Sequence, residues 1–170
     1  MVTSRIAATG AGIPDQIITN DDLAKIMDTS DEWIRQRTGI GERHISGGED
    51  LSYYTSKAAK QIIERAGIAP EDIELIVVAT VTADYCTPSA ACMVQKEIGA
   101  VNAVAFDVTA ACSGFLYGVS VADKFIRCGV YKNALVIGGE ILSKIVDWKD
   151  RSTCVLFGDG AAGVLLERSE

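Results

Sequence analysis

The stretch that decides the fold is Asp107-Val108-Thr109-Ala110-Ala111-Cys112-Ser113-Gly114-Phe115, in which a buried strand turns into a helix at a cysteine. A helix start offers unpaired N–H groups and about half a positive charge, and both favour a thiolate over a thiol. The neighbours of Cys112 are small, which leaves room for a substrate, and strand ends in parallel sheets are where ligands bind. Most free cysteines are small buried hydrophobes. Cys112 is nevertheless a candidate nucleophile, because it lies at the junction of a strand and a helix.

Apolar runs of strand length alternate with amphipathic stretches along the rest of the chain. We expect strands at residues 5–11, 75–80, 103–108 and 134–138, the last three buried, and a hairpin of residues 153–157 and 161–166. We expect helices at residues 21–27 capped by Asn20, from Thr29 or Ser30 to Gly39, 51–66, 88–98 capped by Thr87, and 113–128 with Leu116, Val119, Ala122 and Ile126 along its packed side. This alternation predicts an α/β fold, a mixed and mostly parallel sheet with helices on both faces.

Composition excludes several classes of protein. The chain has 170 residues, of which 48% are hydrophobic and 23% charged, as in an ordinary globular domain. No apolar run approaches the ~20 residues that span a bilayer, and residues 1–14 lack the features of a signal peptide, so we expect a cytoplasmic protein that does not enter a membrane. The net charge of −7 argues against nucleic-acid binding. Five cysteines without C-x-x-C spacing and a single histidine, His44, indicate neither a disulfide framework nor a metal site.

Two further patterns each have a functional and a structural interpretation. Trp33 and Arg37 are four residues apart and share a helix face, where an aromatic ring and a guanidinium can hold a nucleobase and a phosphate. A solvated helix with Trp33 partly in the core explains the same pattern. Phe157-Gly158-Asp159-Gly160 lacks the helix and lysine of a phosphate-binding loop and is better interpreted as a hairpin turn. We expect His44 to be a surface or hydrogen-bonded residue and not a catalyst.

Five motifs in order along the chain resemble β-ketoacyl-acyl-carrier-protein synthase III, a family of thiolase-fold condensing enzymes. They are Asp28-Thr29-Ser30-Asp31-Glu32-Trp33-Ile34, Arg37-Thr38-Gly39-Ile40, Pro88-Ser89-Ala90-Ala91, Ala110-Ala111-Cys112-Ser113-Gly114-Phe115 and Phe157-Gly158-Asp159-Gly160. The resemblance implies that residues 1–170 form the N-terminal thiolase-like domain, the half that carries the nucleophile.

The resemblance also implies roles for particular residues. Cys112 would accept the acyl group of an acyl-CoA and hold it until malonyl-acyl-carrier protein is decarboxylated onto it. Trp33 and Arg151 would sandwich the adenine of CoA, with Thr29, Arg37 and Thr38 nearby. The acyl pocket would be lined by Leu142 and Phe157, with Thr87 near its tip at a dimer interface, where relatives often carry a bulky aromatic. Acyl-CoA would act as a substrate, with no permanently bound cofactor and no metal.

The family's chain is roughly twice as long, and its catalytic histidine and asparagine belong to the other half. We therefore expect the working protein to include a C-terminal half, as a second polypeptide or a missing segment, and to be a homodimer of complete units. Without that half we expect a large apolar surface to be exposed. Two alternatives stay open: another thiolase-fold enzyme, such as hydroxymethylglutaryl-CoA synthase or a secondary-metabolite ketosynthase, and a non-catalytic CoA-binding or interaction module.

Overall fold

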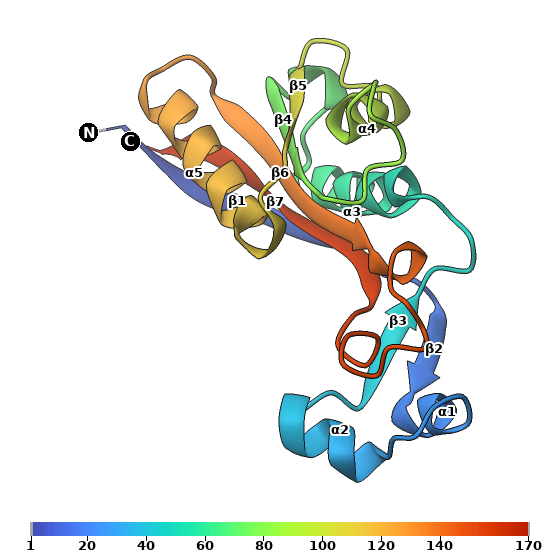
Figure 1. Cartoon of the computed structure of the whole chain (residues 1–170). Coiled ribbons are helices and arrows are strands. Elements are labelled where there is room, and N and C mark those ends of the chain that lie inside the picture. The colour runs from blue at the N-terminus through green and yellow to red at the C-terminus, as the bar shows by residue number, and fades with distance from the viewer. Residues whose placement is uncertain (1, 170) are drawn as a thin grey trace.

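The computed structural model describes residues 2–169, which form one central sheet, helices on both of its faces, and a smaller lobe at one end (Figure 1). The sheet has the strand order β1-β7-β6-β4-β5. The lobe holds the two-stranded sheet β2-β3 and the short helices α1 and α2. The strands are β1 (Thr3–Gly12), β2 (Gln16–Thr19), β3 (Glu42–Ile45), β4 (Leu75–Ala79), β5 (Val104–Val108), β6 (Asn133–Ile141) and β7 (Asp159–Ser169). The α-helices are α1 (Asn20–Ala24), α2 (Asp31–Thr38), α3 (Leu51–Ala66), α4 (Ala90–Ile98) and α5 (Gly114–Arg127).

The strand directions confirm the predicted fold class. Strand β4 pairs in parallel with both β5 and β6, whereas β7 pairs antiparallel with both β6 and β1. Four of the five strands therefore run in one direction and β7 runs against them. Parallel neighbours need crossover connections, and helices α4 and α5 provide them.

Each face of the sheet has its own apolar core. Helices α3 and α4 cover one face, where Ile62, Ile76 and Ile137 are fully buried. Helix α5 covers the other face, where Val77, Val136 and Ile126 are fully buried. Alternation along the strands sends neighbouring residues to opposite cores, so β4 is buried along its whole length as predicted.

The predicted hairpin of residues 153–157 and 161–166 is wrong. Residues 151–156 form turns, because the carboxylate of Asp150 accepts hydrogen bonds from the side chains of Ser152 and Thr153 and so stabilises a bend. Gly158 precedes β7, which begins at Asp159 and pairs with β6 and β1. Cys154 and Val155 are buried in the core of the small lobe, so their apolar character reflects packing and not a strand.

Two predicted helix starts were displaced by one or two residues. Helix α1 is capped by Thr19, since the side chain of Asn20 instead binds Arg43, Asp31 and the carbonyl of Ile40. Helix α4 begins at Ala90 with Ser89 as its cap, so Thr87 does not cap a helix. The predicted ends of α2 and α3 at Gly39 and Gly67 are confirmed, and both glycines have the left-handed backbone that ends helices.

Two predicted burials are also wrong. Strand β5 lies at the edge of the sheet with one neighbour, so Val104 is 49% exposed. On α5, Leu116 is 65% exposed, and the line facing the sheet is Gly114, Gly118, Ala122 and Ile126. Small residues let the helix approach the sheet closely, which hydrophobic spacing alone does not reveal. Among residues 2–169, no helix is both long and apolar enough to cross a membrane.

Candidate active site

Cys112 lies at the predicted junction, in a single 3-10 turn (Ala111–Ser113) between β5 and α5, and its side chain is exposed. The preceding residue, Ala111, has a φ of 45°, which is uncommon for a residue other than glycine. Strained backbone of this kind concentrates at functional sites, where the surrounding structure holds it in place. Ala111 stands directly before Cys112, whose side chain is exposed.

The helix start beside the thiol carries no capping side chain. Helix α5 has none, although α1, α2 and α4 are capped by Thr19, Ser30 and Ser89. The first amides of α3 are bound by the carboxylate of Asp84 instead. No side chain therefore caps the start of α5, although the amide of its first residue, Gly114, already donates to the carbonyl of Ala111 within the 3-10 turn.

An open pocket of about 470 Å³ lies at the carboxyl ends of the parallel strands and includes Cys112. Its wall is made largely of small residues, which leave the thiol accessible, and it includes Ala79, Phe115, Gly138, Glu140, Leu142 and Asp159. Cys112 and Leu142 are thus brought to one pocket. Phe157 and Thr87 are exposed and do not line it. A larger hollow of about 720 Å³ lies between α3 and α4. No cysteine lines it, so we do not consider it a site for a cysteine nucleophile.

Gly114 explains how the helix reaches the pocket. A Cβ atom at this position would come within 3.2 Å of the side chain of Ala79, at the end of β4. The glycine therefore allows the first turn of α5 to lie against the strand end. The thiol is held close to the ends of β4 and β6 for the same reason, because Gly138 faces Phe115 of α5 in a similar way.

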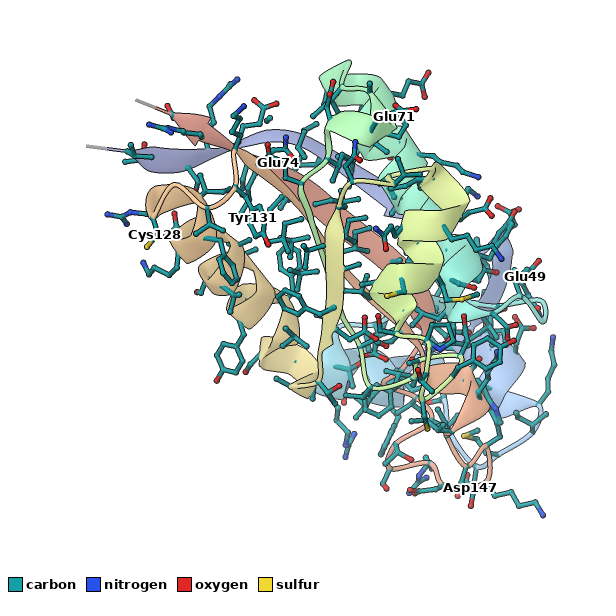
Figure 2. All side chains as sticks on the ribbon, turned by 90° about the horizontal axis from the view of Figure 1, so that it is seen from above. Glu49, Glu71, Glu74, Cys128, Tyr131 and Asp147 are labelled. Atoms are coloured by element: carbon teal, nitrogen blue, oxygen red, sulfur yellow. The ribbon has the colours of Figure 1, made fainter. Side chains whose placement is uncertain are left out.

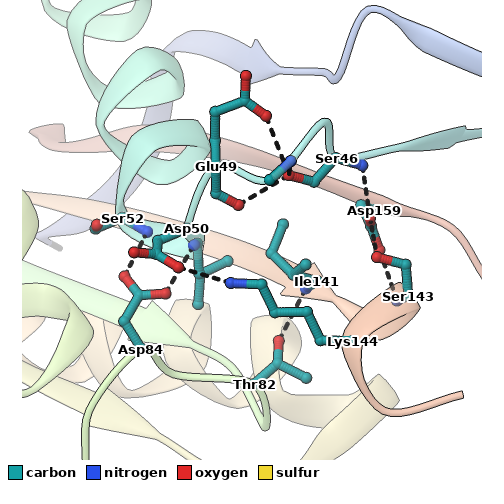
Figure 3. Close-up of polar contacts among 12 residues, drawn as sticks. Ser46, Glu49, Asp50, Ser52, Thr82, Asp84, Ile141, Ser143, Lys144 and Asp159 are labelled. Carbon is teal, nitrogen blue, oxygen red and sulfur yellow. Dashed lines mark hydrogen bonds and ion pairs between the residues drawn. The ribbon is translucent and has the colours of Figure 1, made fainter.

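Two carboxylates in the pocket wall organise the segments around it. Asp159 is buried and accepts hydrogen bonds from the amides of Ser46 and Ser143, at 2.7 and 2.9 Å (Figure 3). Glu140 accepts hydrogen bonds from residues 80–82, directly after β4. Sequence reasoning missed both roles. The available signal was a carboxylate beside glycine at the end of an apolar strand.

A second cluster lies in and beside the small lobe. The guanidinium carbons of Arg37 and Arg151 lie 4.3 and 4.7 Å from the centroid of the Trp33 ring, distances typical of cation–π contacts. Arg151 also donates a 2.5 Å hydrogen bond to the carbonyl of Asp28. The structure thus brings together three predicted site residues that lie up to 118 positions apart, from Trp33 to Arg151.

The other two residues of this predicted cluster, Thr38 and Thr29, differ in their hydrogen bonds. Thr38 donates to the carbonyl of Ile34 and accepts from the amide of Ile40, which closes the end of α2. The hydroxyl of Thr29 is buried without a hydrogen-bond partner. Nδ1 of His44 donates a hydrogen bond to the carbonyl of Pro14 at 2.6 Å, and His44 does not line the Cys112 pocket, in agreement with its expected hydrogen-bonded role.

Arg43 connects the small lobe to the segment that precedes β7. Its side chain, in a residue only 5% exposed, donates to the carbonyls of Ile18 and Val155 and to the side chain of Asn20. Burial lowers the pKa of this guanidinium from its ordinary value. Burial likewise raises the pKa of the neighbouring Cys154 thiol, which makes Cys154 a packing residue.

Known proteins resemble this chain over its whole length. The family of 3-oxoacyl-[acyl-carrier-protein (ACP)] synthase III matches residues 106–170. The β-ketoacyl-[acyl-carrier-protein] synthase III of Lactococcus lactis subsp. cremoris (strain MG1363) is 55% identical over 99% of this chain and 52% of its own length. The chain thus spans about half the length of the curated relatives it matches.

Solved structures give the same result. The 3-oxoacyl-[acyl-carrier-protein] synthase III of Aquifex aeolicus VF5 is 52% identical, with a TM-score of 0.97 over 98% of this chain and 54% of that one. The priming β-ketosynthase of the R1128 polyketide biosynthetic pathway is 34% identical, with a TM-score of 0.95 over 98% of this chain and 50% of that one.

Fold and site together define a thiolase-like domain with a cysteine between a parallel strand and a helix. Within that class, the resemblance to the β-ketoacyl-acyl-carrier-protein synthase III family is confirmed.

Proposed function

We propose that this chain carries the acyl-accepting half of a β-ketoacyl-acyl-carrier-protein synthase III. The observation that supports this most directly is the exposed thiol of Cys112 in an open pocket, beside a helix start that has no capping side chain. The thiolate attacks the carbonyl carbon of an acyl-CoA thioester, a new carbon–sulfur bond forms, and the CoA thiolate leaves. An acyl group that is carried on sulfur remains activated for the second reaction.

In that second reaction, malonyl-acyl-carrier protein loses carbon dioxide and its carbanion attacks the acyl carbon. The product is a 3-oxoacyl-acyl-carrier protein, and the Cys112 thiolate is released. The histidine and asparagine that the family uses for this step belong to a C-terminal half, as part of the same polypeptide or as a separate one. The relatives' length supports this proposal, because the chain spans about half of it.

CoA is proposed to bind in the small lobe and acyl groups in the Cys112 pocket. Trp33, with Arg37 and Arg151 already stacked near its ring, offers an aromatic plane and two cations for an adenine and its phosphates. Thr29 and Thr38 are close in sequence to Trp33 and Arg37, and they are proposed to belong to the same CoA-binding surface. Leu142 lines the acyl pocket, and Phe157 and Thr87 are proposed to complete its wall in the whole protein.

The whole protein is proposed to be a cytoplasmic homodimer. No permanently bound cofactor or metal is required for this chemistry, since the cysteine, the thioester and the carrier-bound malonyl group supply every reacting atom. Among residues 2–169 there is no group of three or more His, Cys, Asp or Glu side chains arranged to hold a metal ion.

Two alternatives differ from this proposal in what they predict. A secondary-metabolite ketosynthase or a hydroxymethylglutaryl-CoA synthase would also form an acyl-cysteine but would use a different second substrate. The identities to the synthases III of Lactococcus lactis and Aquifex aeolicus, 55% and 52%, exceed the 34% to the polyketide priming enzyme and favour the fatty-acid initiator. A non-catalytic CoA-binding module would bind CoA without forming an acyl-cysteine.

Radioactive acetyl-CoA tests the nucleophile in the native gene product that contains these residues. We expect one label per chain, and we expect Cys112→Ala to abolish it. Cys128→Ala is the matched control, because Cys128 is also exposed but lies at the opposite end of α5 (Figure 2). Label that survives Cys112→Ala would contradict the proposal, and labelled enzyme that fails to condense with malonyl-acyl-carrier protein would favour a related condensing enzyme.

A further inference from the structure

The segment between β4 and α4, residues 80–89, begins directly after the pocket residue Ala79 and contains Thr87. Most of its side chains are exposed. The side chain of Glu140 and the backbone amide of Ile141, both in β6, hold the first part of this segment in place. Glu140 also lines the Cys112 pocket.

Both carboxylate oxygens of Glu140 are occupied by this segment. Oε1 accepts from the amide of Val81 at 2.9 Å, and Oε2 accepts from the hydroxyls of Thr80 and Thr82 at 3.1 and 2.5 Å. The hydroxyl of Thr82 in turn accepts a 2.9 Å hydrogen bond from the amide of Ile141 (Figure 3). Glu140 and Thr82 therefore clasp the end of β4 to the end of β6, and we call this pair the clasp.

The clasp reaches the pocket wall through the end of β6. Ile141 is followed directly by Leu142, which lines the pocket. Beyond Thr82, Asp84 binds the amides of Leu51 and Ser52 at the start of α3, at 2.7 and 2.9 Å (Figure 3). A shift of residues 80–82 would therefore reach Leu142 through Ile141, whereas Asp84 ties the segment before Thr87 to the start of α3.

The hydrogen bonds of Glu140 make the position of residues 80–82 sensitive to the loss of a single partner. A half-buried carboxylate with three donors is well satisfied, whereas removal of one partner leaves the remaining polar groups short of a hydrogen bond and favours rearrangement. Charge-assisted bonds of this kind also have narrow geometry, so they fix the position of a loop more sharply than apolar contacts do.

We propose that the clasp of Glu140 and Thr82 positions the wall of the Cys112 pocket and so sets which acyl groups the thiol accepts. The inference rests on the proposed function, since it assigns selectivity to the same pocket. Glu140 and Thr82 act through residues 80–82 and Leu142, so they are positioning residues and not catalytic ones.

Thr82→Val and Thr82→Ser form the matched pair that tests the clasp in the native gene product. Valine has the shape of threonine without the hydroxyl, whereas serine keeps the donor to Glu140 and the acceptor for Ile141. The measurement is the ratio of the Cys112 acylation rate constants for acetyl-CoA and isobutyryl-CoA. We expect Thr82→Val and Glu140→Gln each to change this ratio roughly fivefold or more, and Thr82→Ser to leave it within about twofold.

The double variant of Thr82→Val and Glu140→Gln should change the ratio no more than either single variant, because both remove the same contact. Glu167→Gln is the control for loss of a strand carboxylate, since Glu167 pairs with Arg5 at the other end of the sheet. An unchanged ratio in both Thr82→Val and Glu140→Gln overturns the proposal. So does an equal change in Thr82→Ser and Thr82→Val.

Hydrogen exchange separates failure of this inference from failure of the proposed function. The amides of Val81 and Ile141 should be protected without any substrate and should exchange faster in Glu140→Gln and Thr82→Val respectively, at unchanged melting temperature. Wild-type protein that shows this protection but accepts no acyl group contradicts the proposed function alone. Rapid exchange of both amides in the wild type contradicts the clasp, whatever the acylation result.

Discussion

At the scale of single residues, the five cysteines have the same side chain but differ in their exposure to solvent, which affects their reactivity. Cys112 is exposed in a pocket at a helix start, whereas Cys154 is fully buried in the small-lobe core next to Met27. A thiolate is the reactive form of cysteine, and burial disfavours any charged group. Reactivity is thus decided by where the fold places each sulfur.

Alkylation by iodoacetamide should distinguish these two thiols. Burial, and to a lesser extent the charge of Asp150, raises the pKa of Cys154, so its thiol binds protons more tightly in the folded than in the unfolded chain. That contribution to stability is present below the unfolded pKa of about 8.5 and is lost as the pH rises through the folded pKa. Peptide mass mapping should find Cys112 modified and Cys154 unmodified from pH 7 to 8.5. Modification of Cys154 at the rate of Cys112 would contradict its burial.

Arg37 and Arg35 on α2 provide a matched pair for the proposed CoA surface. Arg37 lies over the Trp33 ring, whereas Arg35 forms an ion pair with Asp31. Arg37→Ala should raise roughly tenfold the acetyl-CoA concentration that gives half of the maximal acylation rate of Cys112. The reason is that a cation is lost from the stacking surface. Arg35→Ala should change it by about twofold or less. Steady-state acylation kinetics check this, and equal effects of the two substitutions would argue against a CoA site at Trp33.

At the scale of elements, the contact between α5 and the sheet places the nucleophile. The helix approaches the strands along glycine and alanine, so its larger residues Leu116 and Tyr117 face away from the sheet. Hydrophobic spacing predicted the helix but assigned Leu116 to the wrong side. Steric fit against Val77 and Val136 decided which side of α5 faces the sheet. Such a fit depends on both packed surfaces, so the spacing within the helix alone does not predict it.

Gly118→Val should test this contact. A Cβ atom at Gly118 would lie 3.1 Å from a methyl group of Val136 and 3.3 Å from one of Val77, so a branched side chain forces the helix outward. We expect a loss of about 1–3 kcal/mol in the free energy of unfolding, measured with urea. Ser120→Val on the exposed side of α5 should cost much less, about 0.5 kcal/mol. Similar losses in both variants would show that helix propensity, and not packing, is responsible.

At the scale of the whole molecule, two cores on opposite faces of one sheet hold the pocket at its end. The exposed apolar residues include Leu116 and Tyr117 on α5 and Ile6 on β1. These residues agree with the expectation of an apolar surface for a further half of the protein, which remains a proposal. The small lobe is joined to this body partly through the amide of Ser46, which donates to Asp159 of β7, so the proposed acyl and CoA surfaces are placed by different parts of the fold.

Ile137→Ala and Ile145→Ala compare the core with the surface. Ile137 in β6 is fully buried, whereas Ile145 is 67% exposed. Truncation in the core should cost about 2–5 kcal/mol in the free energy of unfolding, and truncation at the surface about 0.5 kcal/mol. Urea denaturation gives both values. A small loss for Ile137→Ala would mean that the layer between β6 and α3 is not the tightly packed core described above.

The sequence by itself determined the strand and helix alternation, the strand-to-helix position of Cys112, and the family resemblance, because these depend on local periodicity and motifs. Tertiary structure alone decided that β5 is an edge, that Leu116 is exposed, that residues 153–157 form no strand, and that Glu140 binds residues 80–82. The first, second and fourth depend on contacts between segments far apart in the chain, and the third combines local bonds to Asp150 with the burial of Cys154 and Val155 in the small lobe. Local pattern does not contain that information, since the same apolar residue is buried or exposed according to what packs against it.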